Sequence, residues 1–174
     1  MPSITATQPD SNEYAPYYGK YLSLVPAGDV VETLSRQLDD TLSLLRGLSE
    51  EQADSRYAPD KWSIKEVVGH ILDTERIFAH RAFRFARNDQ QPLPGFEQDG
   101  YVAAAKFGNR RLSDLAAEFE HLRRANLCLF GSLDETAWLR RGVASDNEVS
   151  VRALAYIMAG HEAHHMQIVR ERYL

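Results

Sequence analysis

The stretch that decides the fold is SIKEVVGHILDTERIFAHRAFRFAR, residues 63–87. Ser63 is followed three residues later by Glu66, which is the pattern of a capping box at a helix start. The residues that then recur at helical spacing are Val67, Ile71, Thr74, Ile77, Phe78 and Phe85. This stretch therefore predicts one long amphipathic helix, from residue 63 to about residue 87, with one face turned toward a core.

Three other segments carry the same periodicity. They run from Asp29 to about Gly47, from a cap at Ser113 onward, and from Ser150 nearly to Leu174. The chain contains no convincing alternating pattern of the kind that predicts β-strands. Four long amphipathic segments predict an all-α fold, a four-helix bundle whose neighbouring helices cross at about 20°.

The segments around these helices predict a single domain over residues 1–174. Residues 27–174 form the bundle, and residues 1–26 form an extended N-terminal arm with four tyrosines, which can pack on the bundle surface: Tyr14, Tyr17, Tyr18 and Tyr21. No repeat or low-complexity block divides the chain.

The connection between the second and third helices is long. Residues 88–101, NDQQPLPGFEQDGY, contain two prolines and two glycines, and a short helical piece is expected from Tyr101 to Lys106. Because loops longer than about 12 residues are often functional, Phe96 and Tyr101 are candidates for roofing a pocket. Ordinary packing of the loop is the alternative.

Composition excludes several classes of protein. The 174 residues include 20 Lys plus Arg and 25 Asp plus Glu, a net charge of −5, and this acidic balance argues against nucleic acid as a partner. Cys128 is the single cysteine, so no intrachain disulfide can form and a reducing cytoplasm is expected. No stretch approaches the roughly 20 apolar residues that span a membrane, and the first residues do not resemble a secretory signal.

Three histidines predict a metal site. His161 and His165 lie four residues apart in GHEAHHMQIV, residues 160–169, so on a helix they share one face. His70 lies on the inward stripe of the second helix. Bundles build metal sites from inward side chains on different helices, and imidazoles bind divalent ions at about 2.0–2.1 Å.

Two alternatives accompany this prediction. A single histidine on an apolar stripe is more often a hydrogen-bonded core residue than a ligand, although three would leave costly polar nitrogens in the core. His164 also competes with His165, because counting from Leu154 can place either inside. The step from His161 to His165 diverges by about 40° rather than about 60°, which favours His165.

Asp73 is the candidate catalytic residue. It lies three residues beyond His70, so its carboxylate could orient a bound water or form a hydrogen bond that orients a metal-ligating side chain. The alternative to this catalytic role is a solvated ion pair between Asp73 and Arg76 on the same helix. Glu162 neighbours His161 but is expected to point away from the site.

The strings KWSIKEVVGHILDTERIFAHRAFRFARND, PLPGFEQDGYV and VSVRALAYIMAGHEAHHMQIVRERYL resemble the DinB superfamily and, within it, the YfiT-like metal-dependent enzymes. The resemblance implies a four-helix bundle, often a homodimer, with nickel or zinc held by one histidine of the second helix and two of the fourth. These positions correspond to His70, His161 and His165.

The resemblance also implies an activity on a small molecule. Relatives include transferases and isomerases that use a low-molecular-weight thiol, bacillithiol or mycothiol, as cosubstrate, so a thiol-dependent S-transferase is the leading prediction. Three imidazoles leave coordination positions on a divalent ion free, as catalytic sites require. The alternatives are a metal-dependent hydrolase and a non-catalytic module in which the metal stabilises a dimer.

Overall fold

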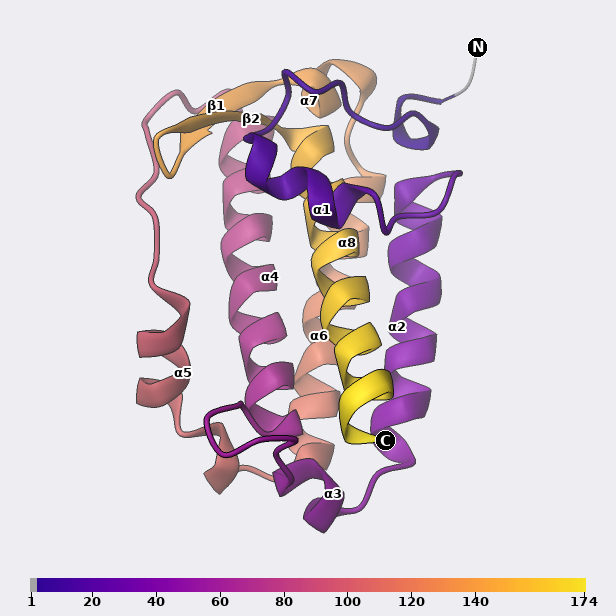
Figure 1. Cartoon of the computed structure of the whole chain (residues 1–174). Coiled ribbons are helices and arrows are strands. Elements are labelled where there is room, and N and C mark those ends of the chain that lie inside the picture. Colours follow the sequence, from indigo (N-terminus) through magenta and orange to yellow (C-terminus); the bar gives the residue numbers. More distant parts are fainter. Residues whose placement is uncertain (1–2) are drawn as a thin grey trace.

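The computed structural model describes residues 3–174, and four long helices form its body (Figure 1). They are α2 (Val30–Arg46), α4 (Ile64–Ala86), α6 (Leu112–Gly131) and α8 (Val151–Ile168), and the last continues as a π-helical turn, Val169–Tyr173. Helix α4 packs most closely against α8, and α2 against α6. The predicted four-helix bundle is confirmed. No helix within residues 3–174 is long and apolar enough to cross a membrane.

Helix α4 is capped by neighbouring residues in the sequence, whereas α6 is capped by a residue far away in the sequence. The capping box at α4 forms as predicted, since the Ser63 hydroxyl accepts from the Glu66 amide at 3.2 Å and the Glu66 carboxylate from the Ser63 amide at 2.7 Å. The predicted cap at Ser113 is wrong, because α6 already begins at Leu112. The Leu112 amide donates to the carboxylate of Glu50 at 2.9 Å, and Glu50 belongs to the short helix α3 (Glu50–Asp54).

The long connection between α4 and α6 returns along the side of α4, so these two helices run parallel (Figure 1). It contains α5 (Gln98–Ala105) and a 3₁₀ turn, Phe107–Asn109. The helical piece therefore begins earlier than predicted, because the Glu97 carboxylate caps it by accepting from the Gly100 amide at 2.7 Å.

The connection between α6 and α8 forms helix α7 (Glu135–Leu139) and a hairpin of β1 (Arg141–Ala144) with β2 (Asn147–Ser150). Each strand has four residues, too few to show an alternating pattern. The hairpin binds the long connection, since the Leu93 amide donates to Val143 O at 2.9 Å and the Ser145 amide to Leu93 O at 3.1 Å. It thereby holds this connection beside α4.

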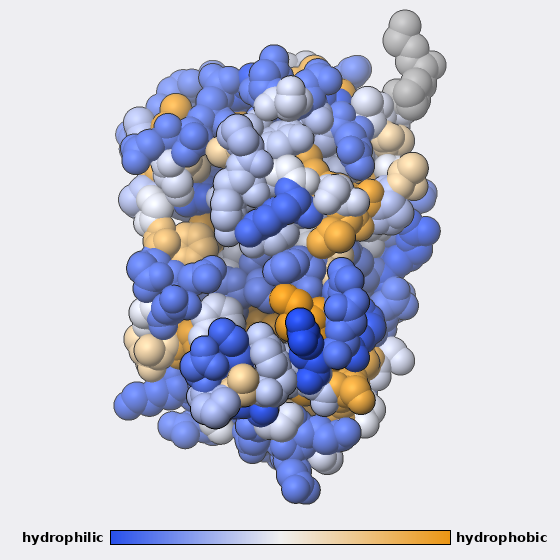
Figure 2. Space-filling model, in the orientation of Figure 1, coloured by the Kyte–Doolittle hydropathy of each residue, from blue (hydrophilic) through white to orange (hydrophobic). Residues whose placement is uncertain are grey.

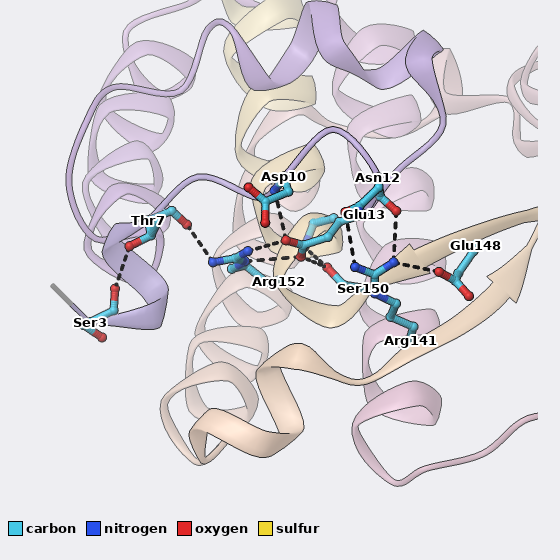
Figure 3. Close-up of polar contacts among 10 residues, drawn as sticks. Ser3, Thr7, Asp10, Asn12, Glu13, Arg141, Glu148, Ser150 and Arg152 are labelled. Atoms are coloured by element: carbon cyan, nitrogen blue, oxygen red, sulfur yellow. Dashed lines mark hydrogen bonds and ion pairs between the residues drawn. The ribbon is translucent and has the colours of Figure 1, made fainter. Parts of the chain in front are cut away.

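The N-terminal arm contains short helices rather than irregular chain alone. These are 3₁₀ turns at Ile4–Ala6 and Pro16–Tyr18 and helix α1 (Gly19–Leu22), which crosses α8 (Figure 1). The buried Glu13 carboxylate fixes the arm by pairing with Arg152 and accepting from the Ser150 hydroxyl at 2.6 Å (Figure 3). Farther along the arm, Tyr21 packs on His161 of α8 and Tyr18 packs on Phe78 of α4.

The apolar core has two parts, separated by a layer of buried polar side chains. One part contains Leu34, Phe78, Phe130 and Leu154, among others. The other contains Leu42, Ile71, Phe119 and Met166, among others. Between them along the helices lie a histidine cluster (His70, His161 and His165) and an ionic cluster (Glu75, Arg123, Asn126 and Glu162).

Candidate metal centre

The three predicted histidines converge on one point between α4 and α8. The Nε2 atom of His161 lies 3.0 Å from Nε2 of His70 and 3.1 Å from Nε2 of His165. One ring nitrogen from each histidine lies within 4.8 Å of the others. Nitrogen ligands about 2.0–2.1 Å from a tetrahedral ion lie about 3.3 Å apart, so these side chains fit a divalent cation.

Burial keeps these imidazoles neutral. It lowers the pKa of His70 to about 4 and that of His165 to about 3, in the latter case with help from neighbouring histidines and Lys20. The pKa of His161, which is buried and faces the other two rings, lies well below its usual value. A neutral imidazole keeps a nitrogen lone pair, which a metal ligand requires. The Thr74 hydroxyl lies 3.4 Å from Nδ1 of His70, on the far side of that ring.

A glycine precedes the first histidine of each helix and lets a neighbour approach closely. A Cβ at Gly160 would lie 2.1 Å from the Tyr21 carbonyl oxygen, and a Cβ at Gly69 would lie 2.3 Å from the Phe107 ring. Glycine is therefore needed where the arm packs on α8 and where the long connection packs on α4. Both contacts occur directly beside a histidine of the cluster, His161 and His70 respectively.

Tyr21 separates His161 from solvent on the arm side. Its ring meets His161 and His164 edge to face, with ring centroids 5.4 Å apart in both pairs. His164 is half-buried, with its ring centroid 5.1 Å from that of His165, and it does not belong to the converging group. The structure thus brings His165, rather than His164, to the centre.

A cavity of about 400 Å³, called here the aromatic cavity, reaches His70 and His161. The arm contributes three tyrosines to its wall, α4 contributes Thr74 and Phe78, and the long connection contributes Gly95 to Gln98. Phe96 lines the cavity, whereas Tyr101 does not and is 48% exposed. The face of the bundle on which α1 and α5 lie is mainly hydrophilic, with small apolar patches scattered over it (Figure 2).

A second cavity of about 320 Å³, called here the polar cavity, reaches His165. Its wall comes from the segment before α4, from the start of α5 and from the end of the chain, with Tyr57, Lys61, Trp62, Asp99 and Tyr173 among its residues. Trp62 also packs on His70, with ring centroids 4.9 Å apart. The histidine cluster is thus accessible from two sides.

Asp73 is not brought to the histidines. Its carboxylate lies 3.7 Å from the Arg76 guanidinium, and Arg76 also pairs with Glu118 of α6. Burial raises the pKa of Asp73, and Arg76 partly offsets this. Within residues 3–174 no hydrogen bond joins its carboxylate to a histidine. The structure therefore corresponds to the ion-pair alternative rather than to the water-orienting role.

The ionic cluster was not predicted from the sequence. Arg123 donates to both oxygens of Glu75, at 2.8 and 2.7 Å, and to Glu162 at 2.6 Å. Asn126 adds a bond to Glu75 at 3.0 Å, and Thr41 adds one to Glu162 at 2.7 Å. Burial alone would lower the pKa of Arg123, but the two carboxylates raise it. The feature of the sequence that could have indicated this cluster is the position of Arg123, a charged residue four positions after Phe119 on the apolar stripe of α6.

A sequence model of the DinB superfamily matches residues 33–169, from α2 to the end of α8. The chain belongs to the DinB superfamily. This DinB-superfamily chain is 25% identical over 142 residues to a protein of Oceanobacillus iheyensis named "Putative metal-dependent hydrolase", a match that covers 80% of this chain and 79% of that protein.

A solved structure has the same fold. YfiT from Bacillus subtilis, described as a probable metal-dependent hydrolase with an unusual four-helix bundle topology, matches with a TM-score of 0.66 and 14% sequence identity. The match covers 96% of this chain and 94% of YfiT. The predicted resemblance to YfiT is therefore confirmed in the fold.

Proposed function

We propose that this chain is a metal-dependent hydrolase of a small molecule, in which His70, His161 and His165 hold a divalent ion, zinc or nickel. The observation that carries the proposal is the convergence of three neutral imidazoles, with no fourth His, Cys, Asp or Glu ligand joining them within residues 3–174. Structural zinc sites usually have four protein ligands, whereas catalytic sites have three. The names of the two relatives support the same reaction class.

A bound divalent ion would supply a nucleophile at neutral pH by lowering the pKa of a coordinated water to about 7. The protein's own residues supply the rest. Neutral His70 and His165 leave the charge of the ion uncompensated, and the Thr74 hydroxyl holds Nδ1 of His70 so that Nε2 faces the centre. Tyr21 and Trp62 pack on the ligand rings and limit the access of bulk water.

Metal analysis tests the site. We expect about one zinc or nickel ion per chain in the wild type and loss of the ion in His70→Ala and His165→Ala. His164→Ala is the matched control, because His164 neighbours the site without joining it. Unchanged metal content in both ligand variants would refute the site. Metal-dependent turnover of an ester and amide panel would then establish hydrolysis.

Thiol transfer is the second candidate, and one observation favours it. Two cavities reach the histidine cluster from different sides, which suits two reactants, a low-molecular-weight thiol and an electrophile. A panel of thiols and electrophiles, compared with the ester and amide panel on the same metal-loaded protein, separates the two reactions. A non-catalytic module would lose thermal stability on metal removal and show no turnover with either panel.

We also propose a homodimer in a reducing cytoplasm, on the family resemblance and the single cysteine respectively. Sedimentation of the purified chain measures the first, and fractionation of the cells measures the second.

A further inference from the structure

We infer that the substrate spans both cavities, with an aromatic or apolar group in the aromatic cavity, an ammonium group in the polar cavity, and the bond to be broken between them at the histidine cluster. This inference rests on the proposed hydrolase function and names its substrate class.

The two cavities meet at the cluster from different sides. The aromatic cavity contacts His70 and His161, and the polar cavity contacts His165. Gln98, the first residue of α5, lines both. Because the three Nε2 atoms lie close together, one small molecule at the cluster can extend into both cavities.

The aromatic cavity suits an uncharged group. Tyr18, Tyr21, Phe78 and Phe96 form much of its wall. Its acidic residue, Glu97, is already engaged, because its carboxylate accepts the Asp99 and Gly100 amides at the start of α5. Apolar and aromatic contact is therefore the main interaction that this cavity offers.

The polar cavity suits a cation. Three aromatic side chains, Tyr57, Trp62 and Tyr173, line it, and aromatic faces attract ammonium groups. Its lysine, Lys61, is paired with Asp60 at 3.1 Å, so these two charges offset each other. Asp99 is exposed in the first turn of α5 and supplies the remaining negative charge.

The substrate class that follows is an ester or amide with an apolar side and an ammonium-bearing side. In hydrolysis the acyl carbon–oxygen or carbon–nitrogen bond breaks, the oxygen of water joins the acyl carbon, and a proton goes to the departing alcohol or amine. No oxidant or reductant is required.

Calorimetric binding of hydroxamates to the zinc-loaded protein tests the inference without measuring turnover. Acetohydroxamate reports the metal alone, phenylacetohydroxamate adds an aromatic group, and 3-aminopropanohydroxamate adds an ammonium group. Butanohydroxamate is the uncharged match for the ammonium probe. We expect the ammonium probe to bind about tenfold more tightly than butanohydroxamate.

Two variants should separate the cavities. Asp99→Asn should remove most of the preference for the ammonium probe and leave the preference for phenylacetohydroxamate over acetohydroxamate unchanged. Phe96→Ala should do the reverse. Asp114→Asn is the matched control for the first, since Asp114 is an exposed aspartate in the first turn of α6. Phe83→Ala, at a phenylalanine 45% exposed on α4, is the control for the second.

The outcomes distinguish the two levels of the proposal. If acetohydroxamate binds equally with and without zinc, the proposed metal site fails. If it binds only with zinc but the ammonium probe gains nothing, or if Asp99→Asn and Phe96→Ala weaken both larger probes equally, the bipartite substrate is refuted and the metal site stands.

Discussion

The two buried clusters in the polar layer of the bundle differ in how their polar atoms are satisfied. In the ionic cluster, charged donors and acceptors from α4, α6 and α8 meet, and Arg123 bonds to Glu75 and Glu162. In the histidine cluster, three imidazoles converge, and Nε2 of His161 lies 3.0 and 3.1 Å from Nε2 of the other two. The first cluster is complete within the protein, whereas the second presents three like groups to a common centre.

This difference distinguishes a cluster that stabilises the fold from a cluster suited to binding a ligand. A buried charge is tolerated when it is paired and hydrogen-bonded, so the ionic cluster requires no ligand. Three neutral imidazoles cannot satisfy one another fully, because each carries one donor and one acceptor nitrogen and three Nε2 atoms converge. We therefore assign the ionic cluster to holding the helices together, and the proposed ion site to the histidine cluster.

The largest expected effect comes from breaking the ionic cluster. Arg123→Met should lower the free energy of unfolding by about 3–5 kcal/mol, because Glu75 and Glu162 stay buried without their cation. Urea unfolding, with and without zinc, measures it, and the loss should be the same in both. Arg124→Met is the control, since Arg124 is exposed and a solvent-screened pair such as that with Glu120 contributes little to stability.

If Arg123→Met does not fold, Thr41→Val gives a smaller test. It removes the bond of 2.7 Å to Glu162 and should lower the free energy of unfolding by about 1–3 kcal/mol. A larger loss for Arg124→Met than for either variant would contradict the structural role of the ionic cluster.

The next effect concerns the histidine cluster alone. Free zinc at 100 times its dissociation constant should raise the free energy of unfolding by about 2.7 kcal/mol in the wild type. His70→Ala should abolish this gain, because one of the three ligands is removed. Thermal unfolding over a zinc titration measures the effect, and an equal gain in His70→Ala would place the ion elsewhere.

The smallest effect is a pH dependence of the metal-free protein. The folded pKa of His70, about 4, lies below its value of 6.5 in an unfolded chain, so the unfolded state binds more protons between these values. Stability should therefore fall as the pH drops from about 6.5 toward about 4, by about 1 kcal/mol per buried histidine at pH 5.5.

Two histidine variants show which imidazoles cause this pH dependence. His70→Leu should lose its share of the decline, whereas His121→Leu, at an exposed histidine of α6, should keep the whole decline. Unfolding titrations at pH 7 and pH 5.5 give the difference, and a flat profile in the wild type would show that the imidazoles are not held neutral.

The sequence predicted those features that depend on residues close together in the chain. The capping box of Ser63 and Glu66 and the helical spacing of the apolar residues gave α4 to within a residue. The four-residue spacing of His161 and His165, together with the inward position of His70, indicated the group that the structure brings together.

Features that depend on distant partners could not be predicted. The α6 start uses Glu50, which is 62 residues away, and no local pattern indicates this contact. The two acidic partners of Arg123 lie 48 and 39 residues away, so no neighbouring residue in the sequence indicates that Arg123 is buried in an ion pair. The hairpin was not predicted because the two residues of its turn, Ser145 and Asp146, have positive φ angles, and no glycine at the turn indicates this conformation.

Anomalous diffraction from crystals of the zinc-loaded protein, recorded at the zinc edge, tests the central claim most directly. We expect one strong peak about 2.0–2.1 Å from the Nε2 atoms of His70, His161 and His165, with the remaining positions facing the two cavities. A peak bound elsewhere, or none at these three nitrogens while the protein is saturated with zinc, would contradict the account.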